Sequence, residues 1–167
     1  RTGKTEFFEK SQCSDMMKAV QASCSMPLLS KMVTVDHKKY LDGGISLPIA
    51  YQRAMDLGYK KIVLVLTRNH GYRKKPLSSL AVRAYNRYFE PLPQLKAALF
   101  EVPDRYNWMQ EEIDRLEQEG RIFVIRPERP VRVSRLERDL KKLQALHQEG
   151  RETAVKLLPA LRSYLEI

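Results

Sequence analysis

A carboxylate followed by two glycines is the arrangement in this sequence best suited to chemistry. Asp42 follows Tyr40 and Leu41, which favour a strand or its end, and precedes Gly43 and Gly44. Glycines allow the backbone to turn sharply and to pass close to another group. A carboxylate on such a turn can face a cleft and accept a proton from a nucleophile. Because Asp-Gly is also common in surface turns, the flanking sequence has to decide between a catalytic aspartate and an ordinary turn.

A helix is predicted before Asp42. Its apolar stripe has the spacing of one helix face and consists of Cys13, Met16, Met17, Val20 and Cys24. Ser11 or Ser14 would cap this helix, and Pro27 disfavours its continuation beyond residue 25. The two cysteines are separated by about three helical turns, too far for a disulfide within the helix, so we interpret them as reduced core residues. A cysteine nucleophile is the alternative, but no histidine is placed to support it.

Strands and a further helix are predicted around and after Asp42. Residues 32–35 and 39–41 have the pattern of a β-hairpin, with its tip at residues 36–38. Pro48 suits the first position of a helix that ends before Gly58. Residues 62–66 form an unbroken apolar run, which is typical of a central parallel strand covered on both faces.

The loop after this strand is basic. Its charged residues are Arg68, Arg73, Lys74 and Lys75. Ligands of open α/β sheets bind at the carboxyl ends of the strands, so this loop is predicted to contact an anionic head group. A solvated loop without a ligand is the alternative.

The order of these segments resembles the patatin-like phospholipase family, most closely its bacterial branch. The resemblance rests on Ala22-Ser23-Cys24-Ser25-Met26-Pro27, on the run from Lys38 to Gly44, and on the strand from Lys61 to Thr67. The family are serine lipid acyl hydrolases that use a Ser–Asp dyad. The resemblance implies that Asp42 is the catalytic aspartate, with Gly43 and Gly44 completing its motif. It also implies a lipid ester substrate and no cofactor.

The family's other catalytic parts are missing from these 167 residues. There is no Gly-x-Ser-x-Gly sequence and no Gly-rich oxyanion loop, and Leu47 stands where the family usually has Asn or Asp. We therefore expect residues 1–76 to be the C-terminal part of a patatin-like catalytic domain, inactive without the remainder of the same polypeptide. A catalytically dead relative of the family is the alternative for the whole protein. The fold class expected is α/β, with a partial, mostly parallel sheet and flanking helices.

Residues 77–167 are predicted to form a mainly helical extension with one further strand near residues 122–126. Pro103 is expected to end a helix, and a stripe from Tyr106 to Leu116 predicts another. Ser134-Arg135-Leu136-Glu137 has the pattern of a capping box. Its helix is expected to end at Gly150, and Pro159 is expected to kink or split the next one. Five acidic residues between 111 and 119 lack His or Cys partners, so we expect a solvated face and no metal site.

The net charge of +10 concerns the partners of the protein. It fits an anionic membrane surface or nucleic acid, and the alternative function is a non-catalytic basic module that binds one of them. No nucleic-acid-binding motif matches, so specific nucleic-acid recognition is not expected. A P-loop at Gly3-Lys4-Thr5 is rejected because the required earlier glycine is absent. We expect a cytoplasmic protein, peripheral at the membrane, whose unpaired sheet edge favours a homodimer.

Overall fold

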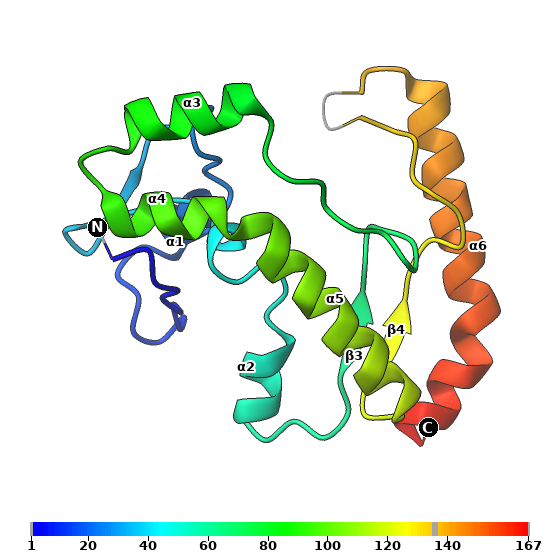
Figure 1. Ribbon diagram of the computed structural model, residues 1–167. Helices are drawn as coiled ribbons and strands as arrows, with labels where there is room; N and C mark the ends of the chain where they lie inside the picture. Colours follow the sequence, from blue (N-terminus) through cyan, green and yellow to red (C-terminus); the bar gives the residue numbers. More distant parts are fainter. Residues whose placement is uncertain (1, 135–136, 167) are drawn as a thin grey trace. The chain divides into compact units, whose positions relative to one another are not determined.

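The computed structural model describes residues 2–134 and 137–166 and has an α/β fold with small sheets and flanking helices (Figure 1). Its residues group into two compact units. The first consists of Arg1–Ala50 and Lys74–Trp108, and the second of Tyr51–Arg73 and Met109–Ile167. Each unit therefore combines two stretches of the chain, and the predicted boundary between residues 76 and 77 stays a prediction.

In the first unit, α1 (Met16–Ser23) begins after Asp15, whose carboxylate accepts a hydrogen bond from the backbone N–H of Lys18 at 3.0 Å. The predicted caps were wrong, because Ser14 instead donates its hydroxyl to the Asp36 carboxylate. The side of α1 that is buried consists of Ala19 and Ala22. Small alanines allow the helix to pack closely on the neighbouring hairpin, while Met17 and Val20 of the predicted stripe are exposed and Met16 is half-buried.

The cysteine predictions are confirmed only in part. Both thiols are free, and Cys13 is half-buried. Cys24, however, is exposed at the end of α1, so its assignment to the core was wrong. The reason is the orientation of α1, which buries its alanines and leaves the opposite side in solvent.

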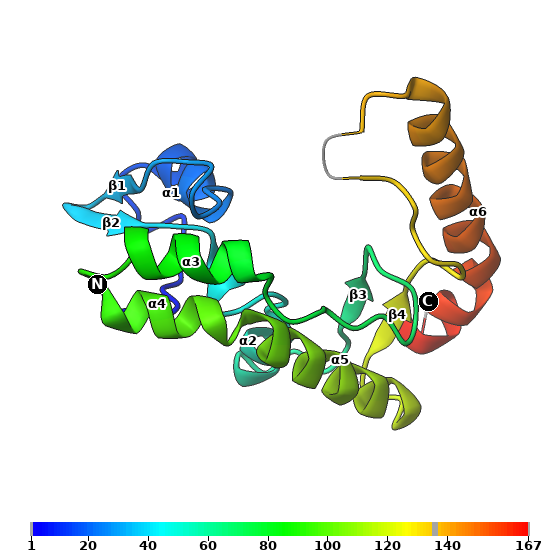
Figure 2. The same cartoon turned by 45° about the horizontal axis from the view of Figure 1, so that its top comes forward.

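The predicted β-hairpin is confirmed (Figure 2). Its strands are β1 (Val33–Val35) and β2 (Lys38–Tyr40), which pair antiparallel with Val33 opposite Tyr40. The two turn residues, Asp36 and His37, both have positive φ, at 44° and 63°. This is the backbone pattern of a tight two-residue hairpin turn. The hairpin leads directly into η1 (Gly43–Ile45), a single turn of 3₁₀ helix.

Three helices complete the first unit: α3 (Ser79–Tyr88), α4 (Pro93–Phe100) and the beginning of α5 (Val102–Gln118). Their core is a cluster of buried side chains made of Ile45, Phe89, Leu95, Ala98 and Leu99. The helix that Pro103 was expected to end, α4, does end before it, at Phe100. Pro103 itself lies in the first turn of the next helix, α5, where a missing N–H costs nothing. Because Ile45 belongs to η1, this core holds the turn after Asp42 in place.

The second unit contains both strands expected from apolar runs, and the structure pairs them, which was not predicted. β3 (Val63–Val65) lies parallel to β4 (Phe123–Ile125), with Val63 opposite Phe123. The buried side chains of the predicted stripe, Met109, Ile113 and Leu116, lie on α5. The prediction that both faces of β3 are covered was wrong for the described residues, because the Val65 side chain is 73% exposed. A hydrophobic run of this length does not show which of its faces is covered.

Two helices of the second unit differ from prediction at their ends. α2 (Tyr51–Asp56) begins at Tyr51, so Pro48 lies in the turn before it. α6 (Leu140–Leu165) begins after Asp139, which accepts hydrogen bonds from the N–H groups of Lys141 and Lys142. It continues through Gly150, which was wrongly expected to end a helix, and through Pro159, which does not split it. The predicted capping box includes residues 135 and 136, which lie outside the described residues.

Tyr164 joins the end of α6 to the parallel sheet. Its hydroxyl donates to the Arg121 carbonyl at 3.0 Å and accepts from the N–H of Ile62 at 3.0 Å, and its ring lies 5.6 Å from that of Phe123. The Tyr164 side chain therefore contacts both the segment before β3 and the segment before β4.

Replacing Tyr51 with Phe is expected to stabilise the protein by about 1 kcal/mol, because a buried hydroxyl without a hydrogen bond is costly. Tyr51 is buried, and its hydroxyl has no partner among the described residues. Burial raises the pKa of Tyr51 to about 12, so the folded state keeps the phenol protonated at pH values where the unfolded chain ionises it. Stability should therefore fall from about pH 10 to about pH 12, and less steeply in Tyr51→Phe. Urea unfolding across this range checks both expectations, and a variant with lower stability at neutral pH would contradict them.

Candidate active site

Asp42 lies where the hairpin ends and η1 begins. Its backbone N–H donates to the carbonyl of Ser25 at 2.9 Å, which attaches it to the segment that follows α1. Its carboxylate caps η1 by accepting a hydrogen bond from the N–H of Gly44 at 2.7 Å. The strand end, the turn and α1 thus determine together where this side chain lies.

The two glycines were expected to permit a sharp backbone turn, but the backbone of this turn does not need them. Neither Gly43 nor Gly44 has a positive φ, so the turn itself does not require glycine. A Cβ at Gly44 would instead lie 3.0 Å from Oδ1 of Asp42, tighter than most real contacts. Glycine at this position therefore lets the Asp42 carboxylate approach the backbone and receive the Gly44 N–H.

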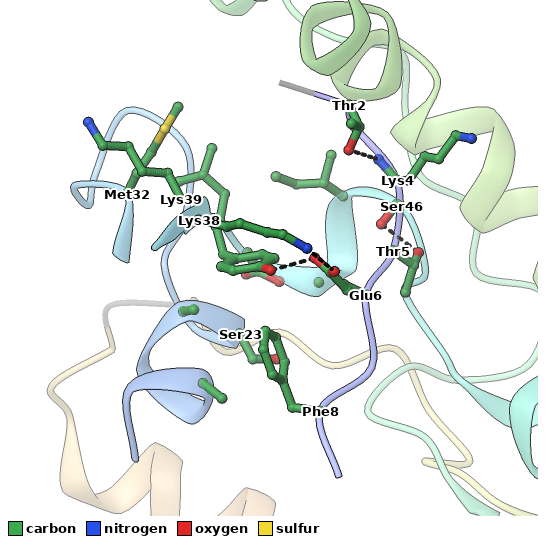
Figure 3. A pocket seen from close by; sticks show the side chains of 18 of the residues that line it. Thr2, Lys4, Thr5, Glu6, Phe8, Ser23, Met32, Lys38, Lys39 and Ser46 are labelled. Carbon is green, nitrogen blue, oxygen red and sulfur yellow. Dashed lines mark hydrogen bonds and ion pairs between the residues drawn. The ribbon is translucent and has the colours of Figure 1, made fainter. Parts of the chain in front are cut away.

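Asp42 faces a cavity of about 940 Å³, which we call the Asp42 cavity (Figure 3). The N-terminal segment, α1, the hairpin, η1 and the beginning of α4 supply its walls. No other described residue donates a hydrogen bond to the Asp42 carboxylate beyond Gly44. The remaining lone pairs of this carboxylate therefore have no hydrogen-bond donor among the described residues.

Ser23 also lines the Asp42 cavity and was not identified as a site residue from the sequence. Its Oγ lies 3.7 Å from the position that a Cβ on Gly43 would occupy, so the hydroxyl is beside the Asp-Gly-Gly turn. The signal was the small-residue segment at the end of α1, but its sequence alone does not show which of its hydroxyls faces the cavity. Ser25, by contrast, is buried and donates to the Gln21 carbonyl.

The second carboxylate of the cavity, Glu6, is already occupied. It accepts hydrogen bonds from the Tyr40 hydroxyl and from Lys38 Nζ, the latter at 3.0 Å (Figure 3). These contacts, that of Tyr40 first, hold the pKa of Glu6 below its usual value. Burial and the bond to Glu6 raise the pKa of Tyr40 to about 12. Glu6 is therefore engaged by two side-chain donors, whereas the Asp42 carboxylate accepts one hydrogen bond, from Gly44.

The basic residues predicted to contact a head group have partners within the protein in three of four cases. In the second unit, the Arg68 guanidinium lies 4.9 Å from the Tyr72 ring, and Arg73 Nε lies 3.7 Å from Glu111 Oε1. In the first unit, Lys74 Nζ lies 4.4 Å from the centre of the Tyr106 ring. Lys75 is exposed, and neither lysine lines the Asp42 cavity. The structure therefore does not bring Lys74 or Lys75 to Asp42.

The acidic residues of α5 are more than a solvated face. Asp114 Oδ1 accepts a hydrogen bond from Arg126 Nη1 at 2.7 Å, and Glu117 pairs with the other amino group of Arg126. His70 Nε2 lies 3.5 Å from the second oxygen of Asp114. The remaining members of the acidic group pair with Arg73 or Arg115. In the described residues no group of His, Cys, Asp and Glu side chains is arranged to hold a metal ion.

The segment that contains Asp42 matches a protein-family model. Residues 5–52, which include α1, the hairpin and Asp42, match the family described as Patatin-like phospholipase. This part of the chain is similar to patatin-like phospholipases. Residues 92–166 match a family described as Domain of unknown function (DUF6363). No curated protein and no solved structure matches the chain.

The patatin-like match supports a family of lipid hydrolases for the N-terminal part of the chain. It ends at residue 52, before the strand at 61–67 on which the expected resemblance also rested. Within the described residues, no helix combines the length and the apolar character needed to cross a bilayer.

Proposed function

We propose that this chain supplies the catalytic base of a serine lipid acyl hydrolase of the bacterial patatin-like branch, and that Asp42 is this base. One observation carries the proposal: the Asp42 carboxylate lies in a large cavity with a single hydrogen bond, from Gly44. The nucleophilic serine and the oxyanion loop would come from the remainder of the same polypeptide, because no Gly-x-Ser-x-Gly occurs in these residues. No cofactor is required.

The role of Asp42 follows from the chemistry of ester hydrolysis. A serine hydroxyl is a weak nucleophile until a base takes its proton. Asp42 would accept that proton as the serine oxygen attacks the ester carbonyl, and would then give it to the departing alcohol. In the second half of the reaction, Asp42 would take a proton from water as the water attacks the acyl-serine, and would return it to the serine oxygen. The Gly44 N–H keeps the carboxylate oriented during both transfers.

The partners proposed for this activity are a lipid ester and an anionic membrane surface, and the location is cytoplasmic and peripheral at the membrane. Arg68, Arg73, Lys74 and Lys75 remain proposed head-group contacts, and of these Arg73 and Lys75 are exposed. A homodimer is proposed as one way to cover the edge of the parallel sheet.

The net charge of +10 favours the alternative, a non-catalytic basic module. That function predicts salt-dependent binding to anionic vesicles or nucleic acid, with no effect of Asp42→Asn on any reaction of the whole protein.

The purified 167-residue chain should hydrolyse no ester above the buffer rate and should not react with a fluorophosphonate probe, because it lacks the activated serine. The measurement is probe labelling followed by mass spectrometry, together with a chromogenic ester assay. Labelling of Ser23, the hydroxyl in the Asp42 cavity, would contradict the proposal that the nucleophile lies elsewhere. Ser23→Ala is the control that distinguishes such labelling from reaction at another site.

A further inference from the structure

Exposed apolar side chains gather on α1 and on the turn that follows it. Met17 and Val20, on the outer side of α1, are 76% and 50% exposed. Leu28 and Leu29, in the turn at residues 26–30, are 43% and 77% exposed. Four large apolar side chains exposed within a short segment are typical of an interaction surface rather than of an ordinary surface.

The turn at residues 26–30 holds its two leucines outward at a conformational cost. It is closed by hydrogen bonds from the N–H groups of Leu29 and Ser30 to the Met26 carbonyl, at 3.2 and 2.9 Å. Leu28 has a φ of +67°, a left-handed conformation that costs a non-glycine residue roughly 1–2 kcal/mol. Glycine would adopt this conformation freely. A leucine in this position lowers stability while adding apolar surface at the tip of the turn.

Beside these side chains lies a basic hollow of about 570 Å³, formed by α1, the turn and β1. Two lysines, Lys18 and Lys31, line it together with polar side chains, and no carboxylate does. Lys31 has no ion pair among the described residues. Lys18 Nζ lies 3.4 Å from Asp15 Oδ2, but both side chains are well exposed, so this pair is weak and exchangeable. The sequence from Met16 to Val35 contains these two lysines and no Asp or Glu.

We propose that the outer side of α1, the turn at residues 26–30 and this hollow form a docking face for an anionic phospholipid surface. Leu28 and Leu29 would enter the boundary between head groups and acyl chains, and Lys18 and Lys31 would contact lipid phosphates. The charge complementarity between a carboxylate-free basic hollow and anionic head groups favours this partner over a neutral one. Figure 2 shows α1 and the turn that follows it side by side.

The docking face is joined to the candidate active site by α1. Val20 belongs to the docking face and also lines the Asp42 cavity, as does Ser23 at the end of the same helix. A lipid ester held at the docking face would thus be next to the cavity that contains Asp42. The inference rests on the proposed function for its lipid substrate, and it adds the surface through which that substrate is approached.

Sedimentation with vesicles tests the docking face. We expect the chain to bind vesicles of phosphatidylcholine mixed with phosphatidylglycerol, and not vesicles of phosphatidylcholine alone. Leu29→Ser should weaken this binding roughly ten-fold or more, because the variant lacks the leucine side chain that would be buried in the lipid surface. Lys31→Gln should weaken it about five-fold, the value of one lysine at an anionic surface. The matched controls are Leu80→Ser, at an α3 position that is 76% exposed, and Lys141→Gln on α6. Neither variant should change vesicle binding.

Leu28→Gly separates docking from folding. Glycine removes the unfavourable left-handed leucine, so this variant should unfold at the same or a higher temperature. Its vesicle binding should nevertheless fall, because the apolar side chain is lost. Unchanged binding in both Leu28→Gly and Leu29→Ser would overturn the proposal, as would an equal loss in Leu80→Ser.

Cys24 provides a direct readout, since it is exposed and lines the hollow. In a Cys13→Ser background, an environment-sensitive dye on Cys24 should shift its emission to the blue with anionic vesicles. The same emission shift with soluble glycerol phosphate would overturn the proposal of a lipid surface and indicate a free phosphate ligand instead. Hydrolysis of a soluble short-chain ester by the whole protein is measured separately. Retained hydrolysis without vesicle binding would reject the docking face alone, whereas binding without hydrolysis would reject only the proposed function.

Discussion

Replacing Asp42 with Asn is expected to lower kcat for a lipid ester by roughly 10²–10⁴-fold in a polypeptide that contains both this chain and the nucleophilic serine. Asn has the same shape, and its side-chain oxygen can still accept the Gly44 N–H, while the backbone bond to Ser25 is unaffected. The turn should therefore keep its structure. What Asn lacks is the ability to accept a proton from the serine and later from water.

The matched control is Glu6→Gln, because Glu6 is the other carboxylate of the Asp42 cavity. Its contacts with Tyr40 and Lys38 already hold its pKa low, so its replacement should change kcat only a few-fold. Equal losses in the two variants would contradict the assignment of Asp42 as the base. Activity that is low in the wild-type protein and unchanged in Asp42→Asn would identify a non-catalytic relative. Thermal unfolding of both variants shows whether either loss reflects the fold.

Replacing Arg126 with Met should reduce the free energy of unfolding by about 3 kcal/mol, near the lower end of the range for breaking a buried ion pair. The Arg126 side chain is 9% exposed, and that of Asp114 is 15% exposed. Without Arg126, the side chain that remains paired with Asp114 among the described residues is the imidazole of His70, at 3.5 Å. The same change releases Glu117, but this side chain is more exposed and can turn to solvent. Urea unfolding measures the loss.

Two further variants test the origin of this effect. Arg115→Met removes an arginine from the same unit that also pairs with two carboxylates, but its side chain is 51% exposed, so the cost should stay below about 1 kcal/mol. Adding Asp114→Asn to Arg126→Met should recover part of the lost stability, because the uncompensated buried charge is gone. A double variant that is less stable than Arg126→Met would contradict this explanation.

Short sequence patterns correctly predicted the hairpin and the strands, because turn residues and apolar runs act within a few residues of each other. The hairpin was predicted from strand residues on both sides of a polar tip, expected at residues 36–38 and found at Asp36 and His37, and β3 and β4 follow from short apolar runs. The Asp-Gly-Gly motif also pointed to the turn that presents Asp42. Helix ends were predicted less well. Asp15 and Asp139 cap α1 and α6 in place of the serines proposed, because several polar residues near a helix start can compete for the same N–H groups.

The sequence by itself determined the α/β class, the hairpin, the existence of two apolar strands and the position of Asp42 after a strand. The pairing of those two strands came only from the tertiary structure. Only the tertiary structure decided which side of α1 is buried, because alanines and methionines of one helix can both satisfy an apolar stripe. Close packing on β1 selected Ala19 and Ala22, which left Met17 and Val20 outside and brought Ser23 to the Asp42 cavity. Long-range contacts also decided which carboxylate of the cavity has side-chain partners: Glu6 is held by Tyr40 and Lys38, whereas Asp42 accepts one hydrogen bond, from the backbone of Gly44.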